Sequence, residues 1–375
     1  MPWYASKSVS GQWGWHWTMD YFKPDNLGST GKRELASHYR PLIGAYDSND
    51  RDLLECQVLL MKFAGINGVI IDWYGTENFR DYATIHRNSL SLIKYIKKAG
   101  LNFAICYEDQ SVKHMINGGK IKKSQELAYA KKEFQWMEQN FFSDPAYMKI
   151  NENPILLIFG PQHFKKDQWP DIISGLSNKP QLFTLPHLKD QINGAGAFGW
   201  PPVHGGKNIS PKVWQQYLQS LYSKSEQNES TIASVFSQFH DIYQQAGVHK
   251  SYGYLDPEGG KTFDQTLEMA LQSDAKLIQI ATWNDYGEGT MIEPTKEFAY
   301  RYLESIQSRF LDDKKFSYGS SDLRLPVHLY QLRKQYESNK EITAQLNRAS
   351  RLLFESKVQG ANKILLRYIP ALSQK

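Results

Sequence analysis

Short apolar segments that alternate with amphipathic helical segments constrain the fold of this chain most strongly. A helical segment at residues 51–64 carries Leu and Met at helical spacing and is followed by an apolar segment. The strand candidates are residues 2–5, 65–72, 101–107, 154–159, 181–184, 196–198, 231–236 and 276–281. They make about eight β/α units over roughly 310 residues, the size of a (β/α)₈ barrel. The predicted fold class is therefore α/β, a (β/α)₈ TIM barrel.

An open, doubly wound sheet is the alternative arrangement for such a pattern. It calls for a glycine-rich phosphate-binding turn after the first strand, and the sequence has none there. Gly259-Gly260-Lys261-Thr262 does not complete a phosphate-loop pattern, because Leu255 stands where that pattern needs glycine. Polar and aromatic residues instead follow several different strands, as on the catalytic face of a barrel. The sequence thus favours the barrel.

The C-terminal part of the chain has a different pattern. After a helical segment at residues 298–310, residues 312–321 are polar and indicate a linker, and residues 325–366 are helix-forming and charged. We expect residues 1–312 to form the barrel and residues 313–375 to form a C-terminal helical extension, a hairpin packed on the barrel. An oligomerisation arm is the alternative; we favour a monomer.

The segment 281–294, ATWNDYGEGTMIEP, carries the strongest functional signal. Asp285 and Glu288 follow an apolar strand three residues apart, and glycines flank Glu288. Two carboxylates in one cleft beside aromatic rings can act as acid and base in breaking a glycosidic bond. We predict Asp285 and Glu288 as the catalytic pair, with Trp283, Asn284 and Tyr286 contacting substrate. A turn cap and an ion pair are the structural alternative.

Further candidates for substrate binding lie near the N-terminus and at strand ends. They are Tyr4, Trp15, His16, Trp17, Asp72, Trp73, Tyr74, Tyr107, Glu108, His204 and Tyr254. Aromatic rings in a polar loop suit stacking on the C–H faces of sugars, although a loop packed onto the barrel explains the N-terminal group equally well. Carboxylates at strand ends can bind sugar hydroxyls or form buried salt bridges.

The composition argues against several other classes of protein. The net charge is +5, but acidic residues are interleaved with the lysines, whereas nucleic-acid binders concentrate basic residues on one face. HExxH and Cys/His ligand spacings are missing, and Cys56 and Cys106 read as buried thiols, so we expect no metal or organic cofactor. No segment approaches the roughly 20 apolar residues of a membrane span. No signal peptide is visible, so the compartment is open; the protein would be secreted or periplasmic if a leader has been trimmed.

Several of these motifs resemble glycoside hydrolase family 99, the endo-α-1,2-mannosidases and mannanases, and the related WbsX-like proteins. They occur in the same order and span residues 1 to about 295. The matching residues are Trp3-Tyr4, Trp13, His16, Trp17, Gly44, Tyr46-Asp47-Ser48, Gln57, Ala64-Gly65-Ile66, Asp72-Trp73-Tyr74-Gly75, Trp283-Asn284, Glu288-Gly289-Thr290 and Ile292-Glu293-Pro294.

The resemblance implies roles for the two carboxylates. In family 99 both are Glu; the first is thought to deprotonate the 2-hydroxyl of the sugar and the second to protonate the leaving oxygen. Carried over, Glu288 is the acid, and Asp285 takes the base position with a side chain one methylene shorter. Asp at this position resembles glycoside hydrolase family 71, the α-1,3-glucanases, which are taken to invert configuration.

The sequence therefore predicts a glycoside hydrolase with an oligo- or polysaccharide substrate, endo-acting on an α-linked, mannan-like glycan, with α-glucan as second choice. One alternative is a non-catalytic glycan-binding protein on a degenerate hydrolase barrel, which the aspartate at position 285 favours. Another is a WbsX-like protein of polysaccharide biosynthesis.

Overall fold

The computed structural model of the chain describes residues 1–28, 31–223, 230–311 and 318–368. The chain forms two compact units. The first consists of Met1–Trp3, Gly68–Leu90 and Asn102–Met291, and the second of Tyr4–Asn67, Ser91–Leu101 and Ile292–Lys375. The predicted boundary between residues 312 and 313 lies outside the described residues and stays a prediction.

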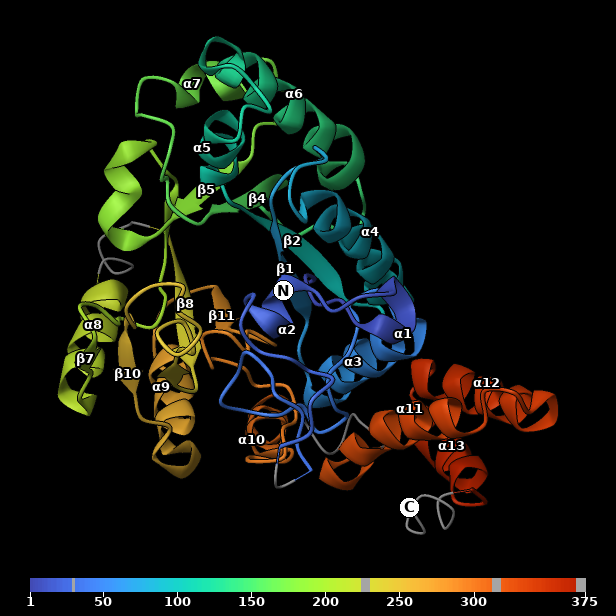
Figure 1. Ribbon diagram of the computed structural model, residues 1–375. Helices are drawn as coiled ribbons and strands as arrows, with labels where there is room; N and C mark the ends of the chain where they lie inside the picture. The colour runs from blue at the N-terminus through green and yellow to red at the C-terminus, as the bar shows by residue number, and fades with distance from the viewer. Residues whose placement is uncertain (29–30, 224–229, 312–317, 369–375) are drawn as a thin grey trace. The chain divides into compact units, whose positions relative to one another are not determined.

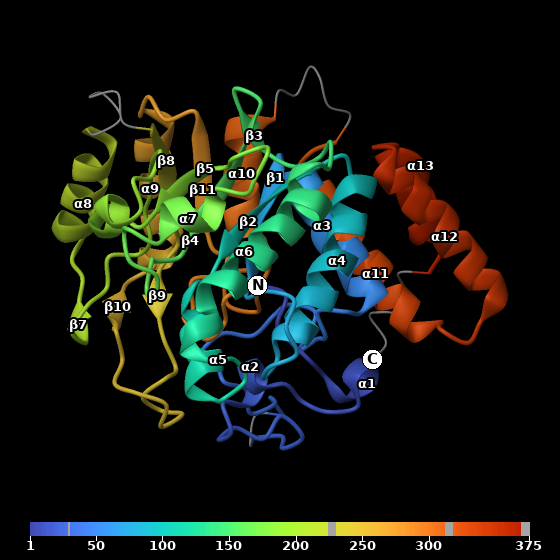
Figure 2. The ribbon, with the colours of Figure 1, turned by 90° about the horizontal axis from the view of Figure 1, so that it is seen from above.

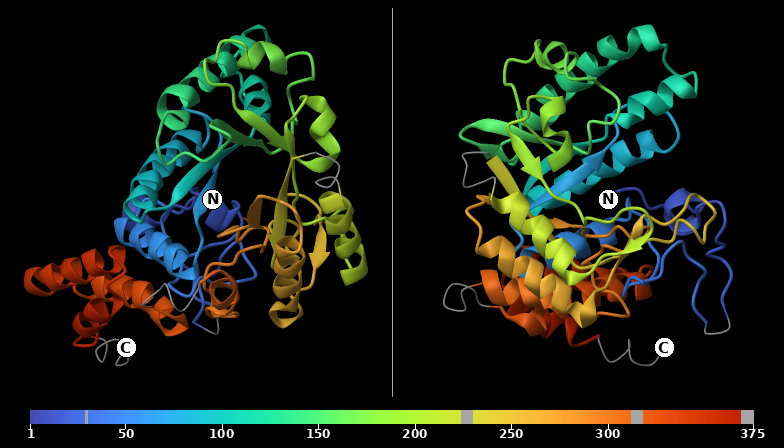
Figure 3. Two further views of the ribbon diagram at one scale, coloured as in Figure 1. Left: turned by 180° about the vertical axis from the view of Figure 1, so that it is seen from behind. Right: turned by 90° about the vertical axis from the view of Figure 1, so that its left-hand side faces the viewer.

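A curled, parallel β-sheet dominates the first unit (Figures 1 and 3). Each strand pairs in parallel with the next, in the order β1-β2-β4-β5-β6-β8-β11. The strands are β1 (Gly68–Trp73), β2 (Asn102–Tyr107), β4 (Asn153–Ile158), β5 (Gln181–Thr184), β6 (Gly196–Phe198), β8 (Ser230–Phe236) and β11 (Leu277–Ala281). The sequence predicts all seven of these strands within a few residues of their observed ends. This half-barrel confirms the α/β fold class.

The predicted first strand, residues 2–5, is not a strand in the structure. Pro2 has no N–H to contribute to a ladder. Instead, Asn284 after β11 exchanges hydrogen bonds of 2.9 and 3.1 Å with the main chain of Met1, and Asn88 on α4 (Tyr82–Lys98) donates one of 2.9 Å to the Pro2 carbonyl. Over the described residues the sheet is therefore open with seven parallel strands, where the sequence predicts a closed barrel of eight.

Helices cover the outer face of this sheet, which explains why its strands are apolar runs rather than alternating ones. In β4 every residue from Pro154 to Ile158 is buried. Figure 1 shows the helices outside the curl, and α8 and α9 both pack on β8. The helices of this unit after β2 are α5 (Gln110–Asn117), α6 (Glu126–Met137), α7 (Trp169–Ile173), α8 (Pro211–Ser223) and α9 (Lys261–Leu271).

Short strands add to the parallel sheet and form a second, smaller one. β3 (Lys149–Ile150) pairs antiparallel with β4. β10 (Gly253–Leu255) lies between β7 (Lys207–Asn208) and β9 (Phe239–His240). Strands of two or three residues carry too little periodicity to be predicted from sequence, and none of these four was expected.

The second unit contains α3 (Arg51–Ala64), as the sequence predicts. The Asp50 side chain caps its first turn by accepting from the Asp52 N–H at 2.9 Å, and Gly65 ends it with φ of 86°. The other helices of this unit near the N-terminus are α1 (Lys7–Ser10) and α2 (Trp15–Thr18). Because α2 is a helical turn, Trp15 and Trp17 do not share the strand-like face that their spacing suggests.

The described part of the C-terminal extension is helical, as predicted, but it contains three helices rather than a hairpin (Figures 1 and 2). They follow α10 (Arg301–Phe310) and are α11 (Leu325–Gln335), α12 (Lys340–Phe354) and α13 (Val358–Leu365). α11 packs against α3. There the Arg333 Nε lies 2.7 Å from Glu55 Oε2, and the Ser350 hydroxyl of α12 also hydrogen-bonds Glu55. Glu55 is buried, so this group ties the extension to α3.

We expect Arg333→Ala to lower the free energy of unfolding by about 3–5 kcal/mol, because it leaves the Glu55 charge buried without its guanidinium. Lys334→Ala is the matched control: the neighbouring Lys334 is 39% exposed and pairs with Asp50 and Asp52, so its loss should cost less than about 1 kcal/mol. Urea denaturation followed by circular dichroism measures both. Equal losses for the two variants would contradict this account of the docking.

Candidate active site

Acidic side chains gather at the carboxyl edge of the parallel sheet, all within the first unit. Asp72 lies in β1, Glu108 follows β2, and Asp285 and Glu288 follow β11. The first three are 7%, 7% and 4% exposed, and Glu288 is half-buried. The negative charges of these groups act on one another, Asp285 on Asp72 and on Glu288, and Asp72 on Glu108. We call these four residues the carboxyl cluster. The structure thus brings together the predicted catalytic pair and two predicted binding residues.

The loop after β11 fixes the catalytic candidates through its own hydrogen bonds. The Thr282 hydroxyl accepts from the Asp285 N–H at 2.8 Å, and Asp285 Oδ1 accepts from the Glu288 N–H at 2.9 Å. The Thr290 N–H closes the turn by donating to the Asp285 carbonyl at 3.1 Å. Gly289, with φ of 69°, provides the left-handed position that this turn needs. The local sequence therefore dictates the geometry of the pair.

A second segment, residues 237–242 after β8, holds this loop from the side. The Gln238 amide donates to the Gly289 carbonyl at 2.8 Å, and the His240 N–H donates to the Glu288 carbonyl at 2.8 Å. The Ile242 N–H donates to the Gly287 carbonyl at 3.0 Å. These three hydrogen bonds fix the backbone at Glu288 and at the residues on either side of it.

Burial and like charge keep protons on this cluster. The pKa of Glu288 is raised well above its ordinary value, first by burial and then by the negative charge of Asp285, while a hydrogen bond from Trp200 opposes the rise. Burial and Asp72 likewise raise the pKa of Glu108. Burial raises the pKa of Asp72 to about 7, against hydrogen bonding by Tyr74. A carboxyl that holds its proton near neutral pH can serve as a general acid.

Sequence reasoning missed two aromatic residues of the site, Trp200 and Tyr243. Trp200 Nε1 lies 3.2 Å from Glu288 Oε2. Tyr243 is half-buried, and the charge of Glu288 contributes, after burial, to a strongly raised pKa of its phenol. Trp200 could have been found, because it follows β6 by two residues, as other candidates follow their strands.

Trp73 and Tyr107 face away from the carboxyl cluster. Side chains alternate along a strand, so they take the opposite face from Asp72 and Glu108. Trp73 is fully buried, stacks on Trp136 with ring centroids 5.7 Å apart, and donates to His86 Nδ1 at 3.1 Å. Tyr107, also fully buried, packs edge-on against Phe134. The structure therefore assigns these two rings to the core and not to substrate contact.

The predicted residues around Asp285 differ in what they offer to a ligand. Tyr286 is fully buried, and the Asn284 amide is engaged with the main chain of Met1. Trp283 is half-buried, and its buried Nε1 has no hydrogen-bond partner among the described residues. Tyr74 is half-buried and hydrogen-bonds Asp72. Trp283 and Tyr74 are therefore the best placed of this group to meet a substrate.

His204 and Tyr254 are two further predicted binding residues, near the smaller sheet. His204 is exposed, with Nδ1 3.3 Å from the Pro202 carbonyl oxygen. Tyr254 lies in β10, edge-on to His240 with ring centroids 5.0 Å apart, and burial and Asp256 raise the pKa of its phenol. Their predicted sugar contacts stay predictions.

The N-terminal aromatic residues belong to the second unit. Tyr4 and Trp17 are fully buried with ring centroids 4.1 Å apart, and Trp17 Nε1 donates to the Tyr46 carbonyl at 2.7 Å. His16 packs edge-on to Tyr4. Trp15 is 39% exposed. This packing matches the structural alternative for Tyr4 and Trp17, whereas sugar stacking by Trp15 and His16 stays a prediction.

Glu293, in the family-like motif after the catalytic loop, also has a structural position in the second unit. Its carboxylate accepts from the Tyr46 hydroxyl at 2.8 Å and from the Gln57 amide at 2.7 Å. Three of the motifs that resemble family 99 therefore meet in one buried hydrogen-bond group.

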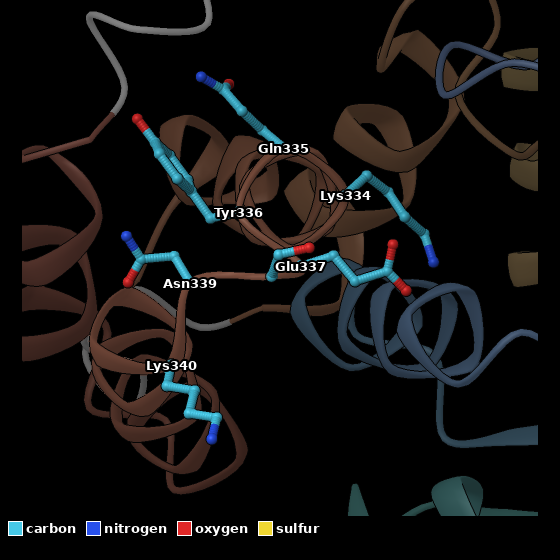
Figure 4. Close-up of a pocket in the computed structure, with 7 residues that line it drawn as sticks. Lys334, Gln335, Tyr336, Glu337, Asn339 and Lys340 are labelled. Atoms are coloured by element: carbon cyan, nitrogen blue, oxygen red, sulfur yellow. The ribbon is translucent and has the colours of Figure 1, made fainter.

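An open surface pocket of about 550 Å³ lies at the turn between α11 and α12, also in the second unit (Figure 4). Its lining is polar, but Lys334 is paired with Asp50 and Asp52, and Asn339 caps α12 by accepting from the Ile342 N–H. These side chains are committed to the helices, so we do not place the active site there.

Among the described residues, no group of three or more His, Cys, Asp or Glu side chains is arranged to hold a metal ion. Over the same residues, no helix is long and apolar enough to cross a membrane.

The chain is similar to one family model and to several solved structures. A family model described as glycosyltransferase WbsX matches residues 29–182. Two structures of the GH99 endo-α-mannosidase from Bacteroides thetaiotaomicron align at 20% and 19% identity with TM-scores of 0.61 and 0.60, covering 82% of this chain and 95% and 94% of theirs. A glycoside hydrolase-like protein aligns at 12% identity with a TM-score of 0.55, covering 73% of this chain and 89% of its own. None of the curated proteins matches the sequence significantly.

These findings confirm the resemblance to family 99 and to WbsX-like proteins. At 20% identity or less, the solved structures establish the shared fold.

The raised pKa of Asp72 predicts a pH-dependent cost to stability. With a folded-state pKa of about 7 against an ordinary value of 3.8, the folded protein loses stability as pH rises between these values. We expect Asp72→Asn to stabilise the protein at pH 8 by on the order of 2–4 kcal/mol and to change little at pH 4. Chemical denaturation at both pH values tests this, with the exposed Asp274→Asn as control. A variant that is less stable than wild type at pH 8 would refute the stated cost.

Proposed function

We propose that this protein is a glycoside hydrolase that cleaves an α-linked glycan at internal bonds. The observation that carries the proposal is the carboxyl cluster, in which burial and the charge of Asp285 keep Glu288 protonated. Cleavage of a glycosidic bond needs an acid that holds its proton beside a carboxylate that stays charged. Glu288 and Asp285 have different environments, so the pair can provide both the protonated acid and the charged carboxylate.

Glu288 is the proposed general acid. It is half-buried, and its proton would pass to the oxygen of the departing sugar. The carboxylate left behind needs a hydrogen-bond donor, and the indole N–H of Trp200 points at Glu288 Oε2 from 3.2 Å. Trp200 would therefore stabilise the charge that develops on the acid during the reaction.

Asp285 is the proposed general base. The Glu288 N–H donates to its carboxylate at 2.9 Å, which stabilises negative charge on Asp285. The same bond fixes the side chain relative to the acid. Asp285 would take a proton either from a sugar hydroxyl or from an attacking water, and these two courses correspond to the family 99-like and family 71-like readings of the motif.

The substrate class rests on similarity. The aligned solved structures are described as endo-α-mannosidases, so an α-mannan-like polymer is the first choice and an α-glucan the second. Buried carboxyls, which can accept hydrogen bonds from sugar hydroxyls, are compatible with either.

Glycosyl transfer is the second candidate, because the matching family model is described as a glycosyltransferase. In that case the donor would be a nucleotide sugar, the base would take a proton from the acceptor hydroxyl, and the acid would assist the departing nucleotide. Release of nucleotide that depends on an added glycan acceptor would favour transfer, and release of oligosaccharides from a polymer in water alone would favour hydrolysis.

We expect the wild-type protein to release oligosaccharides from α-mannan or α-glucan, measured by chromatography. Glu288→Gln and Asp285→Asn should each lower turnover by about 10²- to 10⁴-fold, because each removes a proton-transfer group while nearly preserving its shape. Binding of the polymer should persist in both variants.

The matched control is Glu268→Gln on the exposed face of α9, which should retain full activity. Full activity in both active-site variants would refute the assigned roles. Binding of polymer without cleavage by the wild type would instead support a non-catalytic glycan-binding protein.

The hydrogen bond from Trp200 sets the alkaline limit of activity. It lowers the pKa of Glu288 by stabilising the charged carboxylate, so Trp200→Phe should raise that pKa. An acid must be protonated to act, so the descending limb of kcat/KM at high pH should move to higher pH, while kcat falls. A limb that moves to lower pH, or does not move, would contradict the role given to this bond.

A further inference from the structure

A hairpin beside the acid is not explained by the proposed chemistry. β9 pairs antiparallel with β10, with His240 opposite Tyr254 and Phe239 opposite Leu255. Figure 2 shows the two strands side by side, with the connecting segment extending beyond them. We call residues 239–255 the aromatic arm, because its connecting segment carries Tyr243, His249 and Tyr252.

The base of the aromatic arm is joined to the loop of Glu288. The His240 and Ile242 N–H groups donate to the carbonyls of Glu288 and Gly287 at 2.8 and 3.0 Å. On the other side of the arm, Asp241 Oδ2 accepts from the Tyr252 N–H at 2.8 Å and from the Ser251 hydroxyl at 3.0 Å. The position of the arm is therefore set relative to the acid.

The three rings of the arm contact one another. Ring centroids are 4.5 Å apart between Tyr243 and His249, 4.6 Å between His249 and Tyr252, and 5.8 Å between Tyr243 and Tyr252. Tyr243 is half-buried, whereas Tyr252 is 47% exposed and His249 is also exposed. The group thus runs from the site outward and presents ring surface to solvent.

The inner end of this group lies near Glu288. The charge of Glu288 is the largest electrostatic contribution, after burial, to the raised pKa of both Tyr243 and Tyr252. Asp285 also contributes at Tyr243, and Asp241 contributes at both tyrosines. Together with the hydrogen bonds of His240 and Ile242 to the loop of Glu288, this places the ring group beside the acid.

We propose that the aromatic arm binds the sugar residues of the glycan on the leaving-group side of the scissile bond, by stacking on Tyr252 and His249. This inference rests on the proposed function, since the acid contacts the oxygen of the departing sugar. Aromatic rings stack on the apolar C–H faces of sugars, and a rigid platform beside the acid would hold the departing part of the chain in register. The arm thus selects long glycans over short ones.

The test uses Tyr252→Ala, Tyr252→Phe and, as matched control, Leu271→Ala. Leu271 is 39% exposed and ends α9, near the start of β11 and so at the opposite edge of the sheet. Each is combined with Glu288→Gln, so that binding is measured without cleavage. Isothermal titration calorimetry with mannan- and glucan-derived oligosaccharides of increasing length gives the affinities.

We expect Tyr252→Ala to weaken binding of long oligosaccharides by about tenfold, Tyr252→Phe to retain most of the affinity because the ring is kept, and Leu271→Ala to bind as the parent does. Equal affinity of Tyr252→Ala and its parent for long oligosaccharides would overturn the inference. Loss in Tyr252→Phe as large as in Tyr252→Ala would overturn stacking as the cause.

A parallel cleavage assay without the Glu288 substitution separates this inference from the proposed function. Binding that depends on Tyr252 in a protein that cleaves nothing would refute hydrolysis but support the arm. Cleavage with unchanged KM in Tyr252→Ala would refute the arm but support hydrolysis. If no oligosaccharide binds to any variant, both are overturned.

Discussion

Mutual repulsion among buried carboxyls is the constraint on which the rest of this site depends. Asp72, Glu108 and Asp285 are almost fully buried, and the negative charges of Asp72 and Asp285 act on their neighbours. Four such groups cannot all be ionised in a dry environment, so some must hold protons at a pH where free carboxyls have lost them. The cluster lowers the stability of the fold as pH rises, because ionisation of its buried carboxyls is unfavourable. The same unfavourable ionisation makes an acid available for chemistry. Stability and proposed activity are thus two consequences of one arrangement.

The surrounding main chain is organised to hold this unfavourable arrangement in place. The loop after β11 closes on itself through Thr282, Asp285 and Thr290, and the segment after β8 bonds the carbonyls of Gly287, Glu288 and Gly289. Because the segment after β8 bonds the carbonyl groups of residues 287–289, this support does not occupy the carboxyl of Glu288. The aromatic arm begins within the same segment. The residues that hydrogen-bond the loop of the acid and the residues proposed to stack on the glycan are therefore continuous in sequence.

Sequence reasoning located the strands and the catalytic candidates because both leave local signals. Runs such as residues 154–158 are apolar throughout, and the Asp285 and Glu288 pair follows such a run directly. The face of the sheet on which a strand side chain lies was harder to predict. Trp73 follows Asp72 in sequence but packs in the helix layer, because side chains alternate between the two faces along β1. The predicted strand at residues 2–5 is not formed, and Tyr243 was missed because its proximity to Glu288 arises only when the sheet curls. Long-range arrangement of this kind is invisible to periodicity.

The most direct test of the central claim is a titration of the Glu288 carboxyl by ¹³C NMR on protein labelled at glutamate side chains, compared with Glu288→Gln. The account predicts a glutamate signal that titrates well above the ordinary value of 4.5 and is missing in the variant. If every glutamate signal of the wild type titrates near the ordinary value, burial and like charge do not keep the acid protonated, and the proposed chemistry loses its basis.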